Sequence, residues 1–579
     1  MKRISVRSAV TWILPAILFA IYVRHLTHTG LLDEVLYESG DSAGDMLQVE
    51  RSLERGWFST GHHSDVGVHH PGPFALWLKA AANMLYTFGV GGSVYATTMS
   101  LFLGIRIAFL AVIGWAFTRA SSSHIVGWSS VLGITLLLNH RGTVYGLDWQ
   151  GSTIHFMSVW AVLLMLSGAL LLASGRGGAH LLIIGAGITA HVHTPVFPLG
   201  VLGLFIVALV MLRSFSFSRL KISMWGLWLI FVVPLVTRVF LEPGWPLSYA
   251  RAVSRRKQLA ETLSGSSPLD SLSRVINLPT PLLIVLLALP ALGVLYVWRR
   301  GREAAFVLAA SSLWAAIVLI VSPSQDRVAT ELVWIAGVLL FSAAALLAAL
   351  ASVFVKNFHK IRVLRRYWFV TVLNILVSVA LLVAISVSMT GVLPTAISDS
   401  GGGDGQHVPV FADTIAATGE PFALVLTDPF WFTTSSGVLL ELNRRGLEFC
   451  IVTLTTIRPE LDTFQAPEKF CQPNTKRLPA FMITWDASEG LKELPEKSRL
   501  DFDIESFADK PQDPDRWICS RRPFGGVCLT QLPEDAREIL VSSASVDRAY
   551  GNVLDLRLLS FACTPTLSTG CVELGNAGS

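Results

Sequence analysis

Long runs of apolar residues, separated by short polar segments, dominate the first 392 residues of the chain. The apolar core of a bilayer takes roughly 20 residues of helix to cross, and most of these runs are close to that length. The pattern therefore predicts a polytopic α-helical membrane protein with about 11 spans. The predicted spans are Ala9–Val23, Val94–Thr118, His124–Asn139, Ser152–Ser174, His180–Val196, Phe197–Leu212, Ile222–Leu241, Thr280–Trp298, Ala304–Val321, Glu331–Val355 and Trp368–Val392.

One further apolar run, Phe74–Gly89, is interpreted differently. It contains Lys79 and Asn83, and counting it as a span would invert the predicted side of every later loop. Amphipathic helices of this kind lie in the plane of the membrane surface. We therefore expect Phe74–Gly89 to be a helix on the outer surface of the membrane.

The distribution of Lys and Arg predicts the orientation. Cytoplasmic loops of membrane proteins carry an excess of basic residues. With the spans above, the basic residues gather at the N-terminus and in alternate loops, against a single acid, Glu303. We therefore expect a cytoplasmic N-terminus, an outer first loop and an extracytoplasmic C-terminus in the cell membrane. The basic residues on the predicted inner side are Lys2, Arg3, Arg7, Arg119, Arg176, Arg213, Arg219, Lys221, Arg299, Arg300, Arg302, Lys356, Lys360, Arg362, Arg365 and Arg366.

The character of the chain changes after residue 393, where a Gly-rich linker leads into a segment of ordinary polarity. In that segment Pro421–Thr427 and Leu447–Leu454 have the pattern of buried strands, and Ser435–Arg445 has that of a helix, which suggests a βαβ unit. The expected regions are a membrane domain (1–393) with a large first outer loop (25–93), a linker (394–409) and an extracytoplasmic α/β domain (410–579).

Composition agrees with a membrane protein. The chain is 52% hydrophobic and 15% charged, with 17 Trp and 31 Phe. Soluble domains are about a quarter charged, so an ordinary soluble protein is excluded. The net charge of +4 adds little, because the charges are unevenly placed along the chain. We expect contact with membrane lipids and no nucleic-acid partner.

All six cysteines lie after residue 449, in the predicted outer domain. Cysteines grouped in one polar, extracytoplasmic segment are typical of disulfides formed in an oxidising compartment. Six free thiols are the alternative, and the pairing stays open at this point. The cysteines are Cys450, Cys471, Cys519, Cys528, Cys563 and Cys571.

The segment Tyr37–Pro73 in the first outer loop concentrates acids and histidines in an otherwise apolar chain. If Ser42–Arg55 is a helix, the spacing of four residues puts Asp41 and Asp45 on one face. An aspartate held near the membrane surface can take a proton from a hydroxyl nucleophile, which makes Asp41 a candidate general base. A helix N-cap is the alternative for Asp41. Asp45 is interpreted as a second acid, a metal ligand or part of a solvated helix face.

The same loop ends in the sequence His69-His70-Pro71-Gly72-Pro73, a stiff turn into the next helix. Imidazoles together with carboxylates can bind zinc or manganese, although the spacing matches no known metal motif. A divalent metal site therefore remains open beside histidines that form hydrogen bonds or contact substrate. The other histidines in this loop or near predicted outer ends of spans are His62, His63, His140, His155, His191 and His193.

Arg251, Arg255 and Arg327 lie in predicted outer loops, against the charge bias of membrane proteins. Arginine binds phosphate through paired hydrogen bonds, so a lipid phosphate at the outer leaflet would account for them. Salt bridges or contacts with lipid headgroups are the alternative. Arg106 lies in the middle of a predicted span, where a charge usually faces a cavity or a partner.

This layout resembles the GT-C superfamily of membrane glycosyltransferases, which includes protein O-mannosyltransferases, the lipid A aminoarabinose transferase and mycobacterial arabinofuranosyltransferases. Many members carry Asp, a second acid, Ala, a variable residue and Tyr, then a helix and a Gly. Here Asp41-Ser42-Ala43-Gly44-Asp45 followed by Leu53–Gly56 is similar, with Ser42 and Asp45 as the departures. The run HHPGPFALWL resembles the His-Pro-Gly-Pro turn of bacterial members. The resemblance covers residues 1–390 in layout and the first 90 by motif.

The resemblance implies inverting transfer of a sugar, such as arabinofuranose or mannose, from an undecaprenyl- or decaprenyl-phosphate donor. The acceptor would be an extracytoplasmic glycan, lipid or protein, and Asp41 would be the catalytic base. Two other functions stay open: a lipid-linked sugar transporter or flippase, and a non-catalytic envelope assembly protein. The expected substrate contacts are Asp45, His69, His70, Arg251, Arg255 and Arg327.

Overall fold

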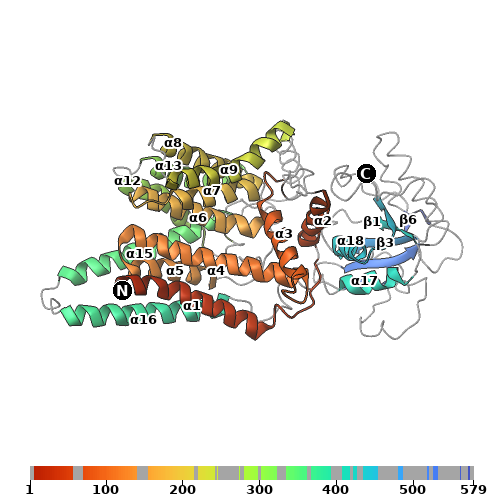
Figure 1. The fold of residues 1–579 in the computed structure, drawn as a ribbon, viewed down its shortest axis with the longest axis horizontal. Helices are drawn as coiled ribbons and strands as arrows, with labels where there is room; N and C mark the ends of the chain where they lie inside the picture. Colours follow the sequence, from red (N-terminus) through yellow and green to blue (C-terminus); the bar gives the residue numbers. More distant parts are fainter. Residues whose placement is uncertain are drawn as a thin grey trace. The chain divides into compact units, whose positions relative to one another are not determined.

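The computed structural model divides into two compact units (Figure 1). Unit 1 comprises Met1–Val35 and Ser52–Ser400, and unit 2 comprises Leu36–Arg51 and Gly401–Ser579. The division after Ser400 lies within the predicted linker, whereas the predicted domains did not anticipate that Leu36–Arg51 groups with the C-terminal part. The structure describes residues 6–38, 40–55, 61, 70–139, 154–213, 219–241, 244–245, 273, 279–297, 302–321, 334–360, 367–392, 407–417, 421–426, 434–453, 480–486, 518–520, 526–532, 561–562 and 572–573.

Unit 1 is helical, and each predicted span coincides with a helix. The ends mostly agree within a few residues, since long apolar runs bounded by polar residues mark helix limits well. The chain breaks between α7 and α8, where Pro195 lies in a short 3₁₀ turn. The helices are α1 (Val6–Thr29), α4 (Val94–Ser121), α5 (His124–Asn139), α6 (Ile154–Ala173), α7 (Ala179–Val192), η2 (Thr194–Val196), α8 (Phe197–Arg213), α9 (Arg219–Leu241), α12 (Thr280–Val297), α13 (Arg302–Val321), α15 (Ile335–Lys360) and α16 (Tyr367–Val392).

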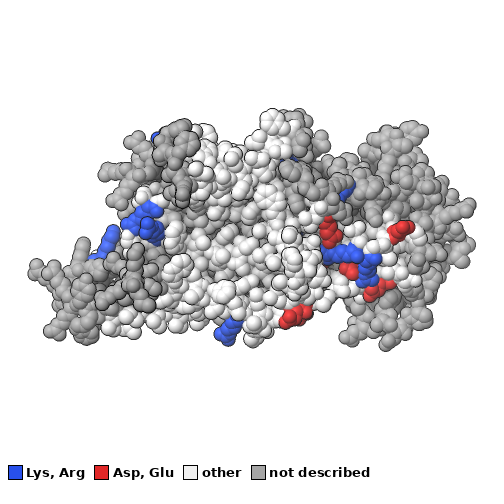
Figure 2. Space-filling model, in the orientation of Figure 1, with Lys and Arg blue, Asp and Glu red and all other residues white. Residues whose placement is uncertain are grey.

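These helices make the protein a multi-pass membrane protein. Among the described residues, 5 helices are both long and apolar enough to cross a bilayer, and several shorter apolar helices accompany them. The face drawn in Figure 2 is largely free of charged side chains over the helices. The number of 11 spans and the orientation remain predictions. The five segments are Val94–Ser121, Thr194–Arg213, Ile222–Phe240, Ile335–Asn357 and Val372–Met389.

Small residues let the central helices of unit 1 approach closely. A Cβ atom added at Gly185 of α7 would overlap the backbone of Met165 in α6, and one added at Gly200 of α8 would overlap the backbone of Ala190. Helices in membranes pack through such small residues, because apolar side chains gain little from leaving lipid. Arg106 of α4 is fully buried in this bundle, as expected for a charge within a span.

The run Phe74–Gly89 forms α3 (Phe74–Thr87), the helix expected at the membrane surface. At 14 residues the helix is short, roughly 21 Å long. Lys79 is buried on one side of α3, whereas Phe88 just after its end is 79% exposed. The helix is therefore suited to lie along the membrane, and this placement stays a prediction.

Unit 2 contains a sheet with the strand order β2-β1-β3-β5-β4. Strands β1 and β2 pair in parallel, with α18 between them in the chain, as the strand–helix–strand pattern predicted. Helices α17 and α18 cover apolar side chains of β1, such as Phe422 and Leu424. The elements are α2 (Gly40–Arg55, which continues into unit 1), α17 (His407–Ala416), β1 (Phe422–Leu426), α18 (Thr434–Arg444), β2 (Phe449–Thr453), β3 (Ala480–Asp486), β4 (Ile518–Ser520), β5 (Gly526–Leu532), and the separate pair β6 (Phe561–Ala562) and β7 (Val572–Glu573).

Candidate functional site

The candidate base Asp41 lies in the first turn of α2. This helix begins at Gly40, so Asp41 is its second residue and not the residue before it. A carboxylate in this position interacts favourably with the partial positive charge of a helix N-terminus. The side chain of Asp41 lies outside the described part of the structure, and its catalytic role remains a prediction.

Asp45 follows Asp41 by four residues on the same helix, as the spacing predicted. Its side chain is fully buried, so the interpretation of Asp45 as part of a solvated helix face is wrong. The neighbouring apolar residues Ala43, Met46 and Val49 are also fully buried. A buried carboxyl group is stable only with polar or charged partners, and Asp45 takes part in such an interaction.

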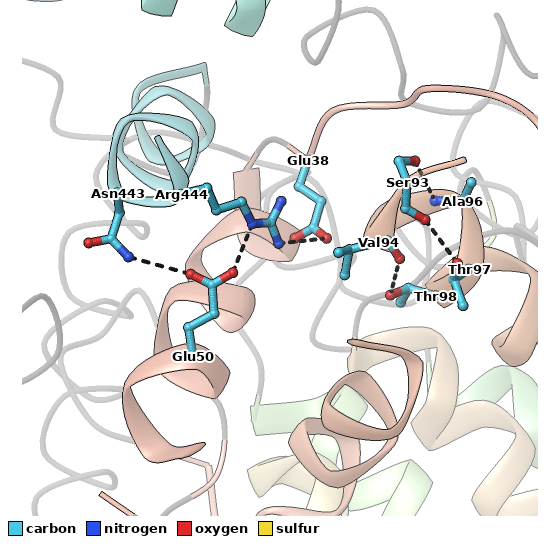
Figure 3. Close-up of polar contacts among 9 residues, drawn as sticks. All are labelled: Glu38, Glu50, Ser93, Val94, Ala96, Thr97, Thr98, Asn443 and Arg444. Atoms are coloured by element: carbon cyan, nitrogen blue, oxygen red, sulfur yellow. Dashed lines mark hydrogen bonds and ion pairs between the residues drawn. The ribbon is translucent and has the colours of Figure 1, made fainter. Parts of the chain in front are cut away.

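Polar contacts with α18 hold the chain on both sides of Asp41, at Glu38 before α2 and at Glu50 in the second half of α2 (Figure 3). The Arg444 Nε atom lies 2.8 Å from Glu50 Oε1, and an Arg444 Nη atom lies 3.9 Å from Glu38 Oε1. Asn443 Nδ2 also donates to Glu50 Oε2 at 3.5 Å. Burial by itself lowers the pKa of Arg444, but the nearby carboxylates of Glu38 and Glu50 outweigh it and raise this pKa. The guanidinium therefore stays charged throughout the physiological pH range.

A second polar group lies in unit 1, where the turn around His70 packs on the end of α7. The Gly72 N–H donates to the His191 carbonyl at 3.0 Å, and the Thr194 N–H donates to His70 Nδ1 at 3.2 Å. Arg238 Nη1 of α9 donates to the His70 carbonyl at 2.6 Å. Since His70 Nδ1 accepts the hydrogen bond from the Thr194 N–H, the ring proton of a neutral His70 lies on Nε2.

Aromatic contacts surround this turn and fix the histidine rings. His191 Nε2 lies 2.7 Å from the Phe231 carbonyl, and a carbonyl only accepts, so Nε2 carries the proton. The Trp77 ring of α3 lies 5.8 Å from the His191 ring, centroid to centroid. The guanidinium of Arg238 lies 4.9 Å from the centre of the Trp245 ring, a cation–π distance. The described contacts of His191 are thus those of a hydrogen-bonding histidine, one of the alternatives weighed above.

Several predicted site residues lie outside the described residues. They include His69, Arg251, Arg255 and Arg327, whose roles remain predictions. His70 is buried and its hydrogen bonds with Thr194 hold the turn, while a contact between His70 and substrate stays a prediction. Within the described part of the chain, no group of three or more His, Cys, Asp or Glu side chains could hold a metal ion. A divalent metal bound by other residues of the loop stays a prediction.

The sequence interpretation missed two basic residues that organise these sites. Arg238 could have been found from the sequence, because it is a charged residue inside a predicted span, as Arg106 is. Arg444 carried no signal, because a surface arginine at the end of a short helix is ordinary. Its partner Glu50 is 394 residues away in the chain.

Two comparisons of sequence with known proteins gave no match: neither a protein-family model nor a curated protein resembles the chain at a significant level. The comparison of structures gave distant likenesses. ArnT from Cupriavidus metallidurans, solved with bound undecaprenyl phosphate, is similar with a TM-score of 0.46 at 13% identity, over 89% of this chain and 97% of ArnT.

The apo form of the same ArnT is similar with a TM-score of 0.45. An Archaeoglobus fulgidus oligosaccharyltransferase tethered to an acceptor peptide has a TM-score of 0.39 at 12% identity, over 74% of this chain and 63% of that enzyme.

Proposed function

We propose that the protein is an inverting membrane glycosyltransferase that transfers a sugar from a polyprenyl-phosphate donor to an extracytoplasmic acceptor. The observation that carries this proposal is α2: a helix in the first long segment after α1 that bears Asp41 in its first turn and a buried acid, Asp45, one turn later. The similarity of this segment to the GT-C motif supports the same assignment.

In this mechanism Asp41 is the general base. An acceptor hydroxyl attacks the anomeric carbon of the donor while Asp41 takes the hydroxyl proton. The bond between the anomeric carbon and the phosphate oxygen breaks, and its electron pair leaves with the polyprenyl phosphate. Attack opposite to the leaving group inverts the configuration. A phosphate leaves without protonation, so one carboxylate suffices, whereas glycosidases need two.

The donor phosphate requires cations, and the chain offers them at several places. We assign Arg251, Arg255 and Arg327 to phosphate binding, since guanidinium groups pair with phosphate oxygens in bidentate fashion. Asp45, His69 and His70 are assigned to substrate contact in the same loop. The proposed setting is the cell membrane, with a cytoplasmic N-terminus and the acceptor, a glycan, lipid or protein of the cell envelope, on the outer side.

The test uses the full-length protein purified into phospholipid vesicles. Decaprenyl-phosphate arabinofuranose and a polyprenyl-phosphate mannose are supplied separately as donors, with a cell-envelope fraction as acceptor, and sugar incorporation is measured. We expect Asp41→Asn to lower transfer by roughly 10²–10⁴-fold while expression and donor binding change little, because Asn is nearly isosteric but accepts no proton at neutral pH.

Two sets of variants sharpen this experiment. Asp33→Asn is the matched control, an exposed aspartate eight positions before Asp41, and should leave transfer unchanged. Arg255→Gln and Arg327→Gln should weaken donor binding, since a lost phosphate contact acts before the chemical step. Equal activity of Asp41→Asn and the unaltered protein would contradict the proposal. Transport of the donor across the vesicle membrane without transfer would instead indicate a flippase.

A further inference from the structure

Arg444 contacts α2 and the residues before it from two sides. Glu38 precedes the helix by two residues and Glu50 lies in its second half, with Asp41 between them in sequence. The Glu38 side chain is fully buried and that of Glu50 is 18% exposed, whereas Arg444 remains 28% exposed. One guanidinium thus pairs with carboxylates on both sides of the residue that carries the proposed base.

The surroundings of this pair are closely packed. A Cβ atom added at Gly437 of α18 would overlap the carbonyl of Glu38, so the backbone before α2 lies directly on α18. Leu47 of α2 packs against the apolar core of unit 2, which contains Val438 and Leu442 of α18. Residues 36–51 therefore belong to the C-terminal unit through apolar, backbone and ionic contacts together.

We propose that Arg444 is a positioning residue for the transfer reaction and that the C-terminal unit acts through it to hold Asp41. This inference rests on the proposed function. A general base works only within hydrogen-bond reach of the hydroxyl proton, and a displacement of about 1 Å can lower a rate by roughly 10²-fold. An anchored α2 keeps Asp41 within that tolerance, and a loose α2 does not.

The neighbouring residue supplies a matched control. Arg445 also forms two ion pairs, at 2.6 Å to Asp413 and at 2.9 Å to Glu441, and neither partner lies in the α2 segment. Its pKa is likewise raised by these carboxylates, against a burial effect that lowers it. Arg444→Gln and Arg445→Gln therefore remove the same group from adjacent positions of one unit, and only the first releases α2.

The first measurement is hydrogen–deuterium exchange of the full-length protein in vesicles, which requires no activity. We expect Arg444→Gln to raise the exchange rates of the amides in 40–51 by roughly tenfold or more, since the hydrogen bond and ion pairs of a charged group with Glu50 and Glu38 are lost. Arg445→Gln should leave these amides unchanged, and Arg444→Lys should recover part of their protection. Unchanged exchange in Arg444→Gln overturns the inference, whatever its activity.

The second measurement is steady-state transfer kinetics. We expect Arg444→Gln to lower kcat by roughly tenfold or more with an unchanged KM for the donor, and Arg444→Lys to restore part of kcat. A looser α2 with full kcat overturns the positioning role. If the substitutions only destabilised unit 2, both arginine variants would contain a smaller fraction of active protein. Arg445→Gln would then lose activity as well. If Asp41→Asn transfers normally, the proposed function fails, and the exchange measurement still tests whether Arg444 holds α2.

Discussion

The contact between the His70 turn and α7 leads to a sharp prediction at Gly72. A Cβ atom added at this position would lie 2.5 Å from both Cγ and Nδ1 of His191, well inside van der Waals contact. Gly72 is not among the glycines with positive φ, so alanine fits the backbone and the effect of Gly72→Ala is steric. His191 cannot easily rotate away, because its ring is held by the Phe231 carbonyl and by Trp77.

The magnitude follows from two terms. Overpacking in a buried region costs about 1–3 kcal/mol. The shift of the turn that relieves part of the clash also breaks the hydrogen bond from Gly72 N–H to the His191 carbonyl, which costs about 0.5–1.5 kcal/mol more. We therefore expect Gly72→Ala to lower the free energy of unfolding by about 1.5–4.5 kcal/mol, the sum of these terms.

Thermal unfolding in detergent, followed by intrinsic Trp fluorescence, measures this loss as a lower Tm. Gly226→Ala is the control: it makes the same chemical change in α9, where an added Cβ meets nothing within 4 Å. In a double-mutant cycle, His191→Ala should remove most of the cost of Gly72→Ala, because the ring that clashes is gone. Equal Tm values for Gly72→Ala and Gly226→Ala, or strict additivity in the cycle, would refute the described packing.

Two further predictions concern the cysteines and the orientation. Cys519 and Cys528 are directly opposite each other on the antiparallel strands β4 and β5. Such pairs have Cα separations within the range of disulfides, so we expect one disulfide there. Peptide mapping of the unreduced protein tests this, and alkylation of both residues as free thiols would contradict it. For the orientation, a cysteine introduced at Ser64 should react with a membrane-impermeant thiol reagent added outside, and one introduced at Arg300 should not. Reaction at Arg300 but not at Ser64 would show the opposite topology.

The helical elements could be predicted from sequence because their signal is local. An apolar run such as His124–Asn139 must satisfy its own backbone hydrogen bonds in lipid, so its length and limits specify a helix directly. The same holds for β1 and β2, whose apolar runs flank α18 and pair in parallel. In each case the residues that decide the structure are adjacent in the chain.

The candidate sites were less accessible because their contacts join distant residues. His70 and Thr194 are 124 positions apart, and no local pattern indicates that a backbone N–H in one segment meets an imidazole in the other. The grouping of 36–51 with the C-terminal unit depends on Arg444 and on the close approach at Gly437, both encoded far from α2. Side-chain type identified the acids, but only the fold identifies their partners.

The sequence shows only the spacing of the two aspartates of α2, whereas the fold shows the burial of Asp45, and this burial changes how the two must be compared. From spacing alone, Asp45→Asn is a natural control for Asp41→Asn, since both residues lie on one helix face. Asp45 is completely buried, so its replacement disturbs a packed polar group. The substitution therefore lowers stability in addition to removing any chemical role of the carboxylate. A loss of activity in Asp45→Asn therefore identifies a second base only if exchange in 40–51 and Tm are unchanged. Asp33→Asn, which removes an exposed carboxylate outside this helix, is the control in which transfer, exchange and Tm should all stay unchanged.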